Sequence, residues 1–184
     1  MNTMKMNDYV EEISVPDGIT VQFSGTMLTV SKGKFSIKRD FVDPRLDIKA
    51  EGNKIVIKVA RLTRKEKMQV GTFAAHMRNM INGVNEPFVY KLKVCAGHFP
   101  MNITIAGKTM TVKNFVGEKV PRVLEFRDGV DVKLEAADIT VTSPDKELAG
   151  QTASAIELLC RRPGFDPRIF QQGIYITEKA GKLA

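Results

Sequence analysis

The chain has 184 residues, of which 43% are hydrophobic, so it is long enough to bury a core in one domain or in two small ones. Its 28 Lys and Arg against 21 Asp and Glu give a net charge of +7, which favours an anionic partner such as nucleic acid or an acidic membrane surface. No apolar run approaches the roughly 18 residues of a membrane span, and we see neither a secretory signal nor a disulfide framework, so we expect a cytoplasmic protein outside the membrane.

Short alternating apolar segments between turn signals predict strands in the first half of the chain. These segments are residues 19–23, 27–30, 35–37, 46–50 and 54–59. A helix is predicted next, because Thr63 and Glu66 have the spacing of a capping box. Apolar residues then recur at helical spacing: Val70, Phe73, Ala74, Met77, Ile81 and Val84.

The second half of the chain repeats this order. Strands are predicted over residues 90–94, 102–106, 110–112, 123–126, 130–134 and 139–142. A second helix is predicted with Ser143 as its N-cap and Pro144 as its first residue. Its expected buried residues are Leu148, Thr152, Ala155, Ile156 and Leu159.

Matching segments lie about 80 residues apart, a spacing that indicates internal duplication. The predicted fold class is therefore α+β, with two tandem similar domains, each an antiparallel sheet packed by one helix. We expect the domains to be residues 1–86 and 87–184.

Catalytic chemistry has little support in the sequence. The two histidines, His76 and His98, share no obvious site, and Cys95 with His98 lacks the second ligand pair of a tetrahedral zinc site. Neither a glycine-rich phosphate loop nor a dinucleotide fingerprint is present. We therefore predict no enzyme activity, cofactor, metal or small-molecule substrate; a small hydrolase would need a clustered acid, base or metal.

Basic residues are concentrated after the second helix. Residues 88–159 are balanced in charge, whereas residues 160–184 carry five Lys or Arg against two Asp or Glu. Arg161 and Arg162 precede Pro163-Gly164, and Pro167 restrains the turn that holds Arg168, so a stiffened basic loop is predicted. The alternative is that the arginines end the helix and complement its dipole.

Two other basic segments are candidates for phosphate contact. Lys113 and Lys119 flank a loop around Gly117, with Arg122 just beyond it, although an ordinary exposed hairpin would look the same. Residues 61–67 form a basic cluster at the start of the first helix, where the charge opposes the helix dipole.

Three motifs occur in order in the second half: HFPMN at 98–102, NFVGEK at 114–119 and GIYITEK at 173–179. Together with the duplication and the IxVPxGI pattern at 13–19, they resemble the universal large-subunit ribosomal protein six family, in its archaeal and eukaryotic branch. The resemblance implies a non-catalytic structural protein of the cytoplasmic ribosome. Its implied partners are neighbouring ribosomal proteins and large-subunit rRNA near the sarcin-ricin loop, beside the region where translation factors dock. A free-standing RNA-binding factor remains the alternative.

The expected rRNA contacts combine these motifs with the basic residues. They are Lys93, His98, Phe99, Asn102, Lys113, Asn114, Gly117, Lys119, Arg122, Arg161, Arg162, Arg168, Tyr175 and Lys179. The arginines at 161, 162 and 168 are included for their charge and position, since the resemblance does not extend to them.

Overall fold

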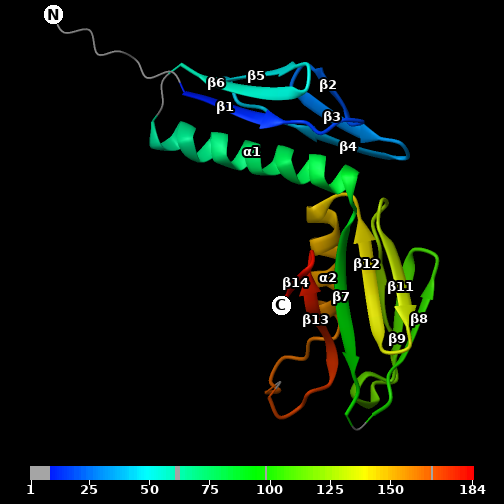
Figure 1. Cartoon of the computed structure of the whole chain (residues 1–184). Coiled ribbons are helices and arrows are strands. Elements are labelled where there is room, and N and C mark those ends of the chain that lie inside the picture. The colour runs from blue at the N-terminus through cyan, green and yellow to red at the C-terminus, as the bar shows by residue number, and fades with distance from the viewer. Residues whose placement is uncertain (1–8, 61–62, 98, 167) are drawn as a thin grey trace, which may run out of the picture. The chain divides into compact units, whose positions relative to one another are not determined.

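The computed structural model describes residues 9–60, 63–97, 99–166 and 168–184. The chain divides into two compact units, Met1–Glu86 and Pro87–Ala184 (Figure 1). Within the described residues each unit contains one α-helix and two antiparallel sheets. Neither of these helices combines the length and the apolar character that crossing a bilayer requires.

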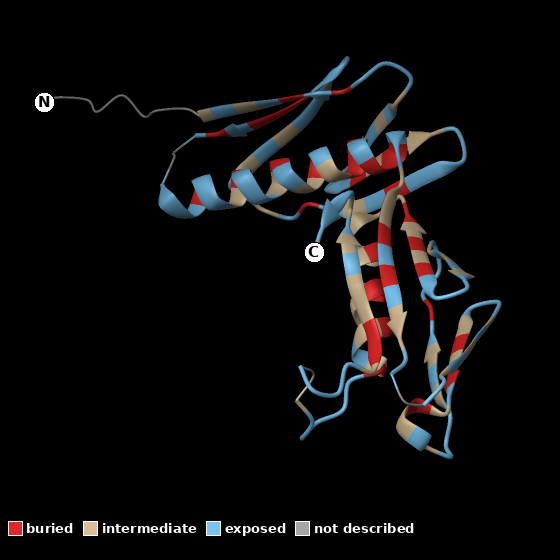
Figure 2. Ribbon diagram, turned by 60° about the horizontal axis from the view of Figure 1, so that its bottom comes forward, coloured by how far each residue is buried: buried red, intermediate tan, exposed pale blue. Residues whose placement is uncertain are grey.

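The first unit has two three-stranded sheets and helix α1 (Arg64–Asn85). One sheet has the order β1 (Tyr9–Ser14), β6 (Lys54–Val59), β5 (Leu46–Glu51), and the other β2 (Thr20–Ser24), β3 (Met27–Lys32), β4 (Phe35–Asp40). Helix α1 packs against β1, β3 and β4. Apolar residues from both sheets and from the helix form one core, and Figure 2 shows the buried residues of α1 recurring along it.

The second unit has a five-stranded sheet, a three-stranded sheet and helix α2 (Lys146–Leu159). The larger sheet has the order β11 (Asp131–Glu135), β12 (Asp138–Ser143), β7 (Phe88–Cys95), β13 (Gly173–Lys179), β14 (Lys182–Leu183). The smaller has the order β10 (Arg122–Glu125), β9 (Thr109–Lys113), β8 (Asn102–Ala106). Helix α2 packs on β7, β12 and β13, and a second, separate core lies beneath it.

The predicted start of α1 is confirmed. Thr63 is its N-cap and accepts a hydrogen bond from the amide of Lys65, while the Thr63 hydroxyl donates to the Glu66 carboxylate. Five of the six residues expected in its buried face are buried; Phe73 is half-buried and Met80 completes the face.

The predicted start of α2 is wrong, since Asp145 is the N-cap and accepts from the amide of Glu147 at 2.9 Å. Ser143 instead continues β12, and its hydroxyl donates to the carbonyl of Gly129 at 2.8 Å. Of the expected buried face, Thr152 and Ile156 are buried, joined by Ala149 and Ala153. Leu148, Ala155 and Leu159 are only half-buried.

The α+β class and the tandem duplication are confirmed, and each unit carries two sheets where one was expected. Three strands were not predicted: β1, β13 and the short β14. Strand β13 is central to the second unit, because it pairs with β7 over most of its length, from Gly173 opposite Cys95 to Lys179 opposite Tyr90.

Candidate nucleic-acid interface

Arg122 lies where three segments of the second unit meet. Its guanidinium binds the Glu118 carboxylate through two hydrogen bonds, Nε to Oε2 at 2.9 Å and Nη2 to Oε1 at 2.8 Å. Nη1 donates to the carbonyls of Leu159 at 2.6 Å and Arg161 at 3.2 Å. The same group lies over the ring of Phe115, 4.4 Å from its centroid. The hydrogen bond from Arg122 lowers the pKa of Glu118 below its usual range.

This arrangement changes the interpretation of two predicted features. Within the described structure the last turn of α2 holds no basic side chain, so Arg161 and Arg162 come after the helix and do not end it. The cation that meets the carbonyl end of α2 is Arg122, from strand β10. We therefore assign Arg122 to internal positioning, because most of its donors are already bonded inside the protein.

The loop after β9 has an unusual backbone. Asn114 (φ 59°), Val116 (φ 51°) and Gly117 (φ 78°) all have left-handed conformations, and for the β-branched Val116 this is strained. Asn114 donates from Nδ2 to the carbonyl of Pro100 at 3.0 Å, and the buried ring of Phe115 anchors the turn η1 (Phe115–Gly117). Asn114 and Phe115 of the NFVGEK motif therefore hold the loop in its conformation.

The 98–102 segment packs on this loop. The ring of Phe99 lies beside Gly117, where an added Cβ would be 3.8 Å away in ordinary contact, so the position favours glycine for its left-handed backbone (φ 78°) and not for space. The carbonyl of Phe99 accepts from Nε2 of Gln172 at 2.8 Å, which ties the segment to the residues before β13. Asn102 is exposed and pairs with the exposed Lys113 across β8 and β9. His98 lies outside the described residues.

The segment between α2 and β13 is held by ring and ion-pair contacts. The guanidinium of Arg162 lies 4.0 Å from the centroid of the Phe165 ring, and Phe165 meets Phe170 edge-on at 5.0 Å. Arg168 binds Asp166 through its side chain, with Nη2 2.8 Å from Oδ2, and through its amide. The exposed side chain of Arg168 is therefore paired with a carboxylate in this structure, and its contact with phosphate stays a prediction.

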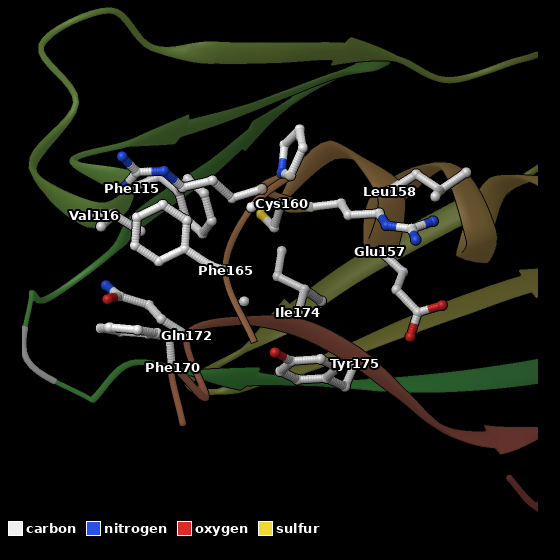
Figure 3. Close-up of a pocket in the computed structure, with 15 residues that line it drawn as sticks. Phe115, Val116, Glu157, Leu158, Cys160, Phe165, Phe170, Gln172, Ile174 and Tyr175 are labelled. Atoms are coloured by element: carbon white, nitrogen blue, oxygen red, sulfur yellow. The ribbon is translucent and has the colours of Figure 1, made fainter. Parts of the chain in front are cut away.

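A cavity of about 460 Å³ lies beneath this segment (Figure 3). The labelled rings of Phe165 and Phe170 lie on one side of it and Tyr175 on the other, with Cys160 and Ile174 between them. Arg161 and Arg162 also line it. Burial raises the pKa of the Cys160 thiol to about 11 and raises the pKa of Tyr175.

The structure therefore brings together some of the predicted contact residues and separates others. One group lies on the loops and strand ends around the cavity and the Arg122 contacts: Phe99, Asn114, Gly117, Arg122, Arg161, Arg162 and Tyr175. Lys119 is exposed on the same loop as Gly117. Lys93 lies opposite Tyr175 in the pairing of β7 with β13. Lys179 lies at the opposite end of β13, roughly 20 Å along the strand from Gly173.

Sequence reasoning missed several residues of this region, among them Phe170, Gln172 and Glu157 as cavity-lining groups. A signal existed in part, since Phe165 and Phe170 are large apolar residues in a loop rich in proline and glycine. In the described part of the chain, no three or more His, Cys, Asp or Glu gather as they would around a metal ion.

Comparison with known proteins gives the family. The family model described as ribosomal protein L6 matches residues 15–86 and 99–173, one segment in each unit. Three similar proteins, each named large ribosomal subunit protein uL6, come from archaea. The protein of Methanococcus vannielii is 42% identical over 94% of this chain and 95% of its own length. The protein of Methanocella arvoryzae is 39% identical over 93% of this chain and 97% of its own length. The protein of Nanoarchaeum equitans is 41% identical over 93% of this chain and 93% of its own length.

The chain belongs to the ribosomal protein L6 family, in its archaeal branch. The members of this family are structural, non-catalytic components of the cytoplasmic ribosome. The resemblance found in the sequence and the prediction that the chain is not an enzyme are both confirmed.

Proposed function

We propose that this structural ribosomal protein is a constituent of the large subunit and binds its rRNA through the loops of the second unit, near the sarcin-ricin loop and the region where translation factors dock. Family membership and the names of its relatives support the ribosomal role. The motifs at 98–102, 114–119 and 173–179 support the location on the rRNA. The observation that carries the proposal is that one guanidinium, that of Arg122, joins the 114–119 loop to the start of the 160–172 segment.

The mechanism is electrostatic and geometric. Lys113, Lys119, Arg161 and Arg162 are exposed cations on or beside these two segments, and neutralising phosphates with them releases counterions. Gly117 and Gly164 have left-handed backbone and carry no side chain, and the missing side chain lets the chain approach a folded RNA closely. Because RNA helices display a wide minor groove and irregular loops, we expect recognition of shape and 2′-hydroxyl groups more than of sequence.

The salt dependence of binding tests this proposal. Replacing Lys119, Arg161 and Arg162 together by Gln should lower the magnitude of the slope of log affinity against log salt by about 2, at roughly 0.7 to 0.9 per phosphate contact. Affinity is measured for protein-free large-subunit rRNA over a series of salt concentrations. We leave Arg168 unchanged because Asp166 already pairs its charge.

A matched control removes the same charge from the first unit. Lys34, Lys38 and Lys58 are exposed there, and their joint replacement by Gln should leave the slope almost unchanged. Equal losses in the two triple variants would show that only total charge matters and would contradict binding by the second unit. On a sucrose gradient the wild-type chain should sediment with large subunits; a chain that stays at the top would favour a free-standing RNA-binding factor.

A further inference from the structure

The cavity under the 160–172 segment is lined by aromatic rings, which the proposed phosphate contacts do not explain. Phe165 is 38% exposed and Phe170 55% exposed, although both rings line the cavity and touch each other. The floor is apolar, since Ile174 and Cys160 belong to the buried core. Aromatic rings held at the mouth of a preformed apolar cavity are typical of a binding site for a flat group.

The charges around the cavity favour an anion beside that flat group. Arg161 and Arg162 line the cavity and are exposed, against one carboxylate, Glu157. Oε1 of Glu157 accepts from the amide of Ile176 at 3.1 Å, so that carboxylate is tied to strand β13. Two guanidinium groups beside a ring-lined cavity disfavour a basic peptide and favour a ligand that joins a phosphate to an aromatic base.

We propose that this cavity binds one unpaired nucleotide of the rRNA, with its base against the rings of Phe170 and Tyr175 and its phosphate against Arg161 and Arg162. The proposal rests on the rRNA binding inferred above and names the element of RNA that enters the second unit. A volume of about 460 Å³ lies within the usual range for small-molecule sites and accommodates a nucleobase. Unstacked bases in RNA loops are commonly held on aromatic and arginine side chains in this way.

The site is largely formed before any ligand arrives, which lowers the entropy lost on binding. Arg122 fixes the carbonyls of Leu159 and Arg161, immediately before Arg162. Gln172 is held by the carbonyl of Phe99 on the other side of the segment. The base therefore meets walls that are already in place.

Ultraviolet cross-linking of assembled large subunits tests the proposal directly. After irradiation and digestion, mass spectrometry should find a nucleotide adduct on Phe170, Phe165 or Tyr175. Phe35, which is 41% exposed on β4 in the other unit, is the matched aromatic control and should carry none. Adducts confined to residues outside the cavity would contradict the proposal.

Substitutions provide a second test that separates stacking from charge. Phe170→Ala and Tyr175→Leu should each weaken binding to protein-free large-subunit rRNA from about fivefold to about a hundredfold. The salt slope should stay unchanged because no charge is lost. Tyr175→Phe keeps the ring and should bind as the wild type does. Phe170 is more than half exposed, so its replacement should leave the fold intact, as circular dichroism would check.

The outcomes distinguish this proposal from the one on which it rests. If the wild-type chain fails to bind rRNA, both proposals fail. If it binds and the triple Gln variant loses slope, but Phe170→Ala and Tyr175→Leu bind with wild-type affinity, only the nucleotide site is overturned. If those two variants bind protein-free rRNA normally and yet are lost from assembled subunits, the cavity holds a segment of a neighbouring protein, which also overturns it.

Discussion

A single guanidinium, that of Arg122, connects a loop, a helix end and a basic segment in the second unit. It makes two hydrogen bonds to Glu118 and two more to main-chain carbonyls, and it covers the ring of Phe115. Its side chain is 24% exposed, so these bonds lie partly out of water and are stronger than those of a surface pair.

Replacing Arg122 by Gln should destabilise the second unit by about 1 to 3 kcal/mol, since it leaves Glu118 and the carbonyl of Leu159 without their charged donor. Arg122→Lys should recover little, because an ammonium group cannot reproduce the two-pronged contact. Equilibrium unfolding in urea measures both. Arg127→Gln is the control, since Arg127 makes one exposed hydrogen bond to Gln151, and a change within about 0.5 kcal/mol is expected. Equal stability of Arg122→Gln and the wild type would contradict the positioning role.

The motifs located the loops of the candidate site but not the direction in which each side chain acts. Asn114 and Gly117 occupy left-handed backbone, a preference that the residue types themselves indicate. The inward role of Arg122 was not predictable, because its carbonyl partner at Leu159 lies 37 residues away in the sequence. The cavity was not predictable for the same reason: Phe115, Cys160 and Tyr175 meet only in the folded chain.

At the scale of elements, Glu66 of the capping box at the start of α1 also contacts a residue distant in the sequence, Arg45. The carboxylate of Glu66 accepts from the Thr63 hydroxyl and pairs with Nη1 of Arg45 at 2.7 Å, and its side chain is only 9% exposed. The Thr63 hydrogen bond first, and then the bond from Arg45, lower the pKa of Glu66 from 4.5 to about 2. The helix is therefore joined at its first turn to the turn that precedes β5.

Glu66 should make the stability of the first unit depend on pH. Because its pKa is lower in the folded than in the unfolded chain, its contribution is complete above about pH 4.5 and is lost as the pH falls towards about 2. Glu66→Gln should therefore be less stable than the wild type at pH 7, and the difference should shrink over this range. Urea unfolding at a series of pH values measures it. A difference that stays constant from pH 7 to pH 2 would contradict this account.

The elements themselves were predictable where one period ran through a segment. Residues 54–59 match β6 at both ends, and the apolar spacing of α1 predicted most of its buried face. Strand β1 was missed because Glu11 and Glu12 interrupt its apolar pattern; it is fixed by pairing with β6. The N-cap of α2 was misplaced because Ser143 finds its partner in the distant carbonyl of Gly129, which the local sequence does not show.

At the scale of the whole molecule, each unit has its own core. The buried residues of the first core run from Ile13 to Val84 and those of the second from Tyr90 to Ile174, with none shared between them. Among the described residues, every strand pairing also stays within one unit. These features support the proposal that the units are separate domains.

Residues 87–184 expressed alone should therefore fold cooperatively, because they contain a complete core, both their sheets and a capped helix. Thermal unfolding followed by circular dichroism would show a single sigmoidal transition. The matched fragment 1–86 should behave in the same way. A gradual, non-cooperative melt of residues 87–184, when the full chain melts cooperatively, would contradict the division into domains.

The pairing of β7 with β13 also sets an order of events while the chain is being made. The described strands of the first unit all precede residue 60, and α1 is the next described element, so this unit has its parts early in synthesis. Strand β7 appears soon afterwards but has no neighbour on one side until residues 173–179 have been added. During that interval the nascent chain exposes an unpaired strand edge that could join another chain. We expect the first unit to fold on the translating ribosome and the second to close only after β13 has emerged.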